Sequence, residues 1–183
     1  RSIPEAAAAA PDLKISFNIP SETWRMIGFA RQKKSVFMSV LGISWFWVVG
    51  ATFLSQFPNF TKLVLGGDET VVTLFMAMFS IGIGLGSLWC NKLLGGNISA
   101  RYVAVGGLAM TAFMIDLSIA TWNSTPAAGT MINASGFMAE ANNWRILFDL
   151  LAISMAAGIF TVPLYAILQH HSERQHRSRT IAA

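Results

Sequence analysis

The chain has few charged residues and a single cysteine, and both shortages limit what it can be. Only 12% of its 183 residues are charged and 54% are hydrophobic, and a mean hydropathy of +0.52 is too high for an ordinary soluble domain. Because Cys90 is the only cysteine, neither a disulfide within the chain nor a cysteine-based metal site can form. The composition therefore indicates a membrane protein.

The sequence also lacks the short motifs of common enzyme classes. It has no H-x-x-x-x-D acyltransferase pair, no HExxH, no GxSxG and no P-loop. Its three histidines, His170, His171 and His176, cluster in a basic segment without the carboxylates or cysteines that usually complete a metal site. We therefore expect a protein that is not an enzyme and that uses no metal or cofactor.

Four apolar runs are long enough to cross a membrane as helices, and they cover residues 35–57, 69–90, 102–122 and 144–168. About 20 helical residues, at ~1.5 Å each, cross a hydrocarbon core of roughly 30 Å. A soluble helical core is the alternative, but too few polar residues remain to cover four such helices. No run alternates with the period of a strand. We therefore predict an all-α membrane protein with four transmembrane helices.

Basic residues gather on one side of these runs, and such residues are retained in the cytoplasm. They precede the first run, separate the second from the third, and follow the fourth: Arg25, Arg31, Lys33, Lys34, Lys92, Arg101, Arg174, Arg177 and Arg179. We predict that residues 1–34 are a cytoplasmic linker, with an interfacial helix able to form over 21–34 behind a Ser21 cap, and that 169–183 are a basic cytoplasmic loop. Charges spread over three membrane-flanking segments do not favour nucleic acid as a partner.

Two acids lie within the apolar runs, where an ionisable residue is costly and is a functional candidate by default. They are Asp116 in the third run and Asp149 in the fourth. Arg145 lies one turn before Asp149 on the same helical face and at a membrane boundary, so it can pair with either acid. The sequence therefore predicts a polar cluster of Asp116, Arg145 and Asp149.

Polar and aromatic side chains also share faces of the first and fourth runs. Trp45, Thr52 and Gln56 gather on one side of the first run, and Ser154, Thr161 and Tyr165 form a polar face on the fourth. The face of the first run suits contact with an amphiphile, but interfacial aromatics and ordinary packing explain it equally well.

Several segments resemble the lysophospholipid transporter branch of the major facilitator superfamily. They are SVFMSVLGISWFWVVGATFLSQFPNF, VLGGDETVVTLFMAMFSIGIGLGSLWC, GIFTVPLYAILQ and ERQHRSRTIAA. The resemblance implies part of the C-terminal half of a twelve-helix bundle, with this chain as a fragment that supplies helices seven to ten. It also implies that helices seven and ten line the cavity and that helix nine, with Asp116, is scaffold. The substrate-binding candidates are then Trp45, Thr52, Gln56, Asp149, Ser154, Thr161 and Tyr165.

The superfamily's cytoplasmic loop motif, G-x-L-x-D-R-x-G-R, is echoed by GSLWCNKLLGG. Gly86, Lys92 and Gly95 fit it approximately. Asn91 stands where the motif has its acid, so the charge relay of the motif is incomplete here.

The function that this resemblance implies is transport of lysophospholipid across a bacterial inner membrane by alternating access, with both ends of the fragment in the cytoplasm. Its partners would be the lysophospholipid, the bilayer and the missing helices of the same transporter. Two alternatives stay open, namely a membrane anchor for a fused phospholipid acyltransferase and a major facilitator for another small amphiphile.

Overall fold

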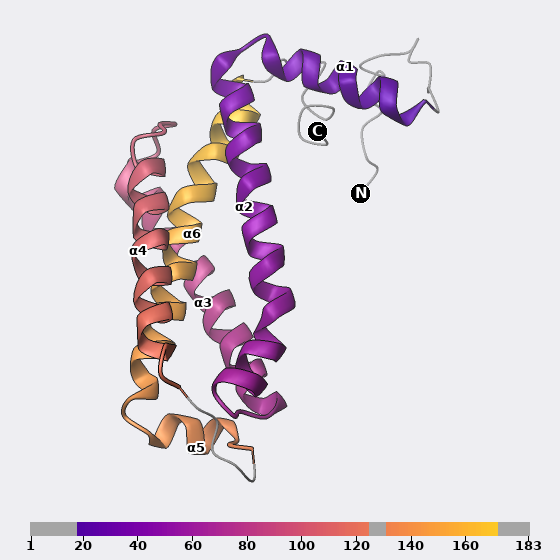
Figure 1. Ribbon diagram of the computed structural model, residues 1–183. Coiled ribbons are helices and arrows are strands. Elements are labelled where there is room, and N and C mark those ends of the chain that lie inside the picture. Colours follow the sequence, from indigo (N-terminus) through magenta and orange to yellow (C-terminus); the bar gives the residue numbers. More distant parts are fainter. Residues whose placement is uncertain (1–17, 125–130, 172–183) are drawn as a thin grey trace, which may run out of the picture.

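The computed structural model describes residues 18–124 and 131–171, and these residues form a helical bundle with one shorter helix at each end (Figure 1). The segments 1–17 and 172–183 of the expected cytoplasmic linker and loop lie outside the described residues, and so does His176. The elements are α1 (Ile19–Arg31), α2 (Lys34–Asn59), the π-helix η1 (Phe60–Val64), α3 (Glu69–Leu94), α4 (Val103–Thr121), α5 (Ala134–Ala139) and α6 (Asn143–His171).

Four helical segments are long and apolar enough to cross a membrane, which confirms the expected helical fold with four helices of spanning length in the described residues. They are Lys34–Val64, Glu69–Leu94, Val103–Thr121 and Asn143–His171. The first is longer than expected because the helix continues through Pro58 into η1 and turns only at Gly66, whose φ of 66° suits glycine. The second continues past Cys90 to Leu94 and ends at Gly95, which has a φ of 55°.

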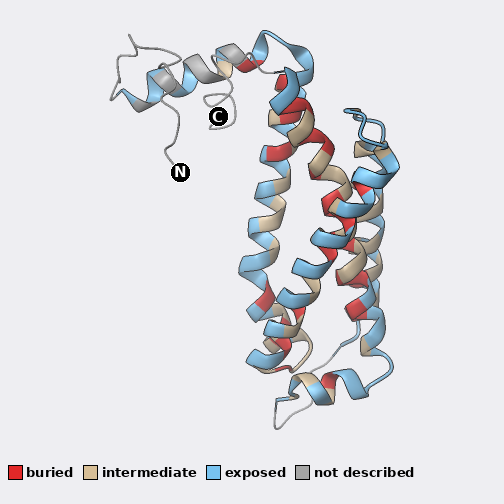
Figure 2. Ribbon diagram, turned by 180° about the vertical axis from the view of Figure 1, so that it is seen from behind, coloured by how far each residue is buried: buried red, intermediate tan, exposed pale blue. Residues whose placement is uncertain are grey.

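Helix α6 is the centre of the bundle and packs against α2, α3 and α4. It has 14 buried residues, more than the other three spanning helices together, while much of their outer surface is exposed (Figure 2). The exposed faces of α2, α3 and α4 are apolar, so they suit lipid or further membrane helices better than water. The core of the bundle therefore lies along one helix.

Glycines let α3 and α6 approach closely. A Cβ built on Gly82 or Gly86 would collide with the backbone of α6, at Leu151 and Met155 respectively. In the other direction, a Cβ on Gly158 would lie 2.7 Å from the backbone nitrogen of Ser87. The GxxxG of α3 therefore forms a backbone-to-backbone contact with α6.

The α1 end of the bundle joins the start of α2 to the end of α6. Ala30, Val36 and Leu168 belong to one buried cluster, and the ammonium group of Lys33 donates to the carbonyl of His171 at 3.1 Å. A cation at the last carbonyl of a helix satisfies an unpaired acceptor and opposes the negative end of the helix dipole. Helix α1 begins at Ile19, and the side chain of Asn18 accepts from Ser21, so the expected Ser21 cap is wrong.

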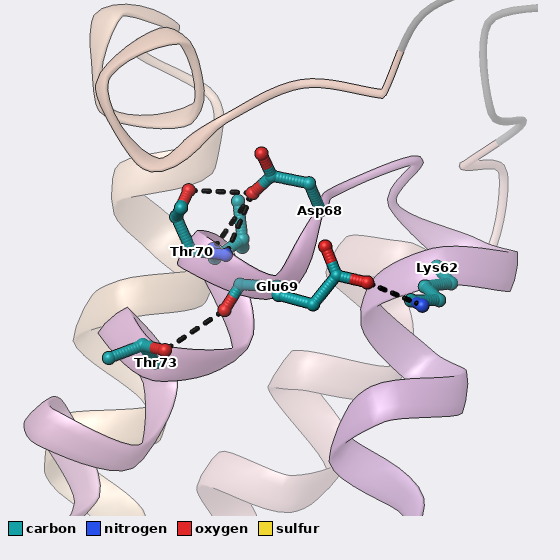
Figure 3. Close-up of polar contacts among 6 residues, drawn as sticks. Lys62, Asp68, Glu69, Thr70 and Thr73 are labelled. Carbon is teal, nitrogen blue, oxygen red and sulfur yellow. Dashed lines mark hydrogen bonds and ion pairs between the residues drawn. The ribbon is translucent and has the colours of Figure 1, made fainter.

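The α5 end is closed by two loops that hydrogen-bond to each other. Gly67 and Ile132 form an isolated β-bridge, and the backbone nitrogen of Ala134 donates to the Thr70 hydroxyl at 2.8 Å. Asp68 caps α3 by accepting from Thr70 and Val71, and the Thr70 hydroxyl that bonds it holds the pKa of this carboxyl below its usual value (Figure 3). The short helix α5 then places Phe137 in the core.

Candidate functional site

A groove runs between α2 and α4, with α6 as its floor. Both outer helices pack on α6 but scarcely on each other. Three hollows follow one another along this line, and they share lining residues: Phe46, Val49, Phe53, Met110 and Met114. Met114 lines all three hollows, so it lies at the middle of the groove.

The hollow nearer the α5 end has a volume of about 300 Å³ and a mixed lining. Its polar side chains are Thr52, Gln56, Ser118 and Thr121, and its apolar ones are Phe53, Phe57, Phe60, Met114, Leu117 and Leu150. The Thr52 and Thr121 hydroxyls donate to carbonyls one turn back in their own helices. Gln56 is bonded to Asn59 rather than to its own backbone, so its amide can turn towards a ligand.

The hollow nearer the α1 end has a volume of about 280 Å³ and is more aromatic. Its lining comes from all three helices and comprises Trp45, Phe46, Val49, Gly107, Met110, Thr111, Met114 and Phe160. Trp45 lies at the edge of this hollow, and the residue is 68% exposed. From Trp45 to Gln56 the groove follows twelve residues of α2, which cover roughly 16 Å of helix, about half the hydrocarbon thickness of a bilayer.

The expected polar cluster lies outside the groove, between α4 and α6. Arg145 makes two hydrogen bonds to the Asp116 carboxylate, one of them 3.1 Å from Nε to Oδ2. This is the bidentate geometry in which an arginine–carboxylate pair is strongest. The side chains of Asp116 and Arg145 are 41% and 51% exposed. Of the two acids within reach, Arg145 therefore pairs with the more accessible one.

Asp149 is placed differently from its neighbours. It is 0% exposed, and neither of its carboxyl oxygens has a hydrogen-bond partner. It lines none of the three hollows, although Asp116 and Arg145 are close enough to act on it electrostatically.

The remaining candidates on α6 make helix contacts. Ser154 donates to its own helix and lies against Gly82 of α3, and Thr161 donates to the carbonyl of Ala157 at 2.8 Å. The Tyr165 hydroxyl accepts from Trp47 of α2 at 2.9 Å. The structure therefore gathers Trp45, Thr52 and Gln56 along the groove, but the wall that faces them belongs to α4.

The α4 wall was not among the expected site residues, yet its sequence carries a signal. Gly107, Met110, Thr111, Met114, Ser118 and Thr121 all line the groove and recur every three or four residues, which is the spacing of one helical face. The resemblance implies that this helix is scaffold, so the predicted site does not include this face.

The residues of the echoed loop motif do not form one loop. Gly86 is buried inside α3 against α6, whereas Asn91 and Lys92 are exposed in the last turn of α3, and Gly95 ends the helix. Gly86 therefore has a packing role here.

No family model, no curated protein and no solved structure matches the chain.

Proposed function

We propose that this chain is the part of a membrane transporter that holds the acyl chain of a lysophospholipid during its passage across the inner membrane of a bacterium. The groove between α2 and α4 is the observation that carries the proposal. It opens along the flank of the bundle, where an amphiphile can enter from the bilayer. In this proposal the α1 end faces the cytoplasm.

The dimensions of the groove suit a lipid with one acyl chain. Its two larger hollows, of about 300 and 280 Å³, lie end to end, and each is near the lower limit of ligand pockets in proteins. The lining is apolar or aromatic for most of its length and gains polar groups near Gln56. A single acyl chain would lie along Phe53 and Met114, with its headgroup near Thr52 and Gln56.

The helices around the groove differ in how firmly they are held. Glycine contacts lock α3 to α6, whereas α2 has fewer contacts with α6 and hardly any with α4. Pro163 lies inside α6 and removes one backbone hydrogen bond there. These features suit a transporter that moves one helix group against another, as in the major facilitator bundle that the sequence resembles.

The proposal is tested by transport of labelled lysophosphatidylethanolamine by the intact protein in proteoliposomes. Albumin removes the lipid that stays in the outer leaflet, so the protected fraction measures translocation. We expect saturable translocation above that of protein-free vesicles, competed by unlabelled lysophospholipid and not by diacyl phosphatidylethanolamine, whose second chain the groove does not fit. Translocation equal to that of protein-free vesicles would contradict the proposal and would favour a membrane anchor.

A further inference from the structure

The Asp149 carboxyl is enclosed without a hydrogen-bond donor for either of its oxygens. Asp149 has no exposed surface, and no group donates a hydrogen bond to either carboxyl oxygen. An isolated buried carboxylate is so costly that such groups take up a proton instead. A neutral carboxyl is the form that this site accommodates.

The charged groups around Asp149 also favour a protonated, neutral carboxyl there. Asp116 on α4 and Arg145 on α6 are the ones that act on it. The other helices packed on α6 carry charged residues only towards their ends, namely Lys34 in α2, and Glu69 and Lys92 in α3. Arg145 is already engaged with Asp116 through two hydrogen bonds. The two acids and one arginine are neutral as a group when they share one proton.

The site is too enclosed for a lipid headgroup. Asp149 lines no hollow of the groove, whereas its neighbour Leu150 does. The small ligand that can reach it is a proton, by way of the half-exposed Asp116 and Arg145 pair.

We propose that Asp149 is a proton-binding site and that Arg145 switches between the two acids. In one state Asp149 carries the proton and Arg145 pairs with Asp116, as observed. In the other state the proton has passed from an Asp149 oxygen to an Asp116 oxygen, and Arg145 pairs with Asp149, one turn away on the same helix. The group stays neutral in both states, and the second state presents the proton at an accessible carboxyl. This inference goes beyond lipid transport and does not depend on which lipid is carried.

Infrared spectroscopy of the purified intact protein tests the inference without any substrate, because a protonated carboxyl has a C=O band well separated from those of carboxylates. We expect that band at neutral pH in the wild type and its loss in Asp149→Asn. We also expect its loss in Asp116→Asn, because Arg145 is then free to pair with Asp149, which gives up its proton. The matched control Glu69→Gln, which removes another acid held in an ion pair, should keep the band.

Three results would overturn the inference. An unchanged spectrum in Asp149→Asn would mean that Asp149 is ionised, and a retained band in Asp116→Asn would mean that no switch exists. Loss of the band on adding sodium ions at constant pH would identify a cation site instead. If Asp149→Asn does not fold, Asp149→Glu replaces it. Its band should persist but should no longer shift when aspartate is labelled with carbon-13.

Discussion

Replacing Gly86 with alanine should destabilise the intact protein by about 1–3 kcal/mol, the usual cost of adding atoms to a packed core. The new Cβ would collide with the carbonyl oxygen, carbonyl carbon and Cα of Met155. All three are backbone atoms of α6, so no rotamer change relieves the collision and the two helices must separate. Because α6 is the helix on which the bundle is built, the effect should extend beyond the substituted site.

Gly84→Ala is the matched control on the same helix, because a Cβ at Gly84 meets nothing within 4 Å. Thermal unfolding of the purified protein in detergent should show a lowered melting temperature for Gly86→Ala and an unchanged or raised one for Gly84→Ala. Equal melting temperatures for the two variants would contradict the close contact between α3 and α6.

Met114→Trp should reduce lysophospholipid translocation by about tenfold or more, the factor that corresponds to ~1.4 kcal/mol of lost binding free energy. Met114 lines all three hollows of the groove, so a larger, rigid side chain there divides the groove between Trp45 and Gln56. The groove has room for the indole ring, so we expect the variant to fold. The measurement is translocation into proteoliposomes at matched protein levels.

Ile115→Trp is the control for this substitution, since Ile115 is the next residue of α4 and is 55% exposed away from the groove. It should translocate at the wild-type rate. A loss of transport in both variants would mean that α4 tolerates no tryptophan here. Wild-type transport in Met114→Trp would show that the lipid does not pass along the groove.

The spanning helices could be predicted from the sequence because length and apolar character determine them directly, whereas their ends depended on local details. The first helix continues beyond Phe57 because Pro58 lacks only its own N–H and the following residues form a π-turn. Helix α5 has only six residues within a loop of small and polar residues, so it produced no periodic signal.

Only part of the polar cluster could be predicted from a single sequence. That Arg145 would pair with an acid followed from the helical spacing, but the choice between Asp116 and Asp149 depends on how α4 and α6 are aligned. Gly106 sets that alignment through its close approach to the backbone of Ala156 and Phe160. Such tertiary alignment has no counterpart in the periodicity of either helix.

Only one wall of the groove could be predicted from the sequence, because the opposite wall depends on tertiary packing. Trp45, Thr52 and Gln56 share a face of α2 by spacing alone, but the helix opposite them is chosen by packing around α6. The resemblance implies that the polar residues of α6, Ser154, Thr161 and Tyr165, face them across the cavity. In the structure they bond to their own helix or to Trp47 instead.

Photolabelling tests whether one lysophospholipid chain lies between α2 and α4, as proposed. A lysophosphatidylethanolamine with a photoreactive group in its acyl chain would be bound to the intact protein, irradiated, and its attachment sites mapped by mass spectrometry. We expect labelling at Phe53 and Met114 that excess unlabelled lysophospholipid removes. Labelling that cannot be competed, or that falls equally on the outward residues Leu108 and Ile115, would contradict it.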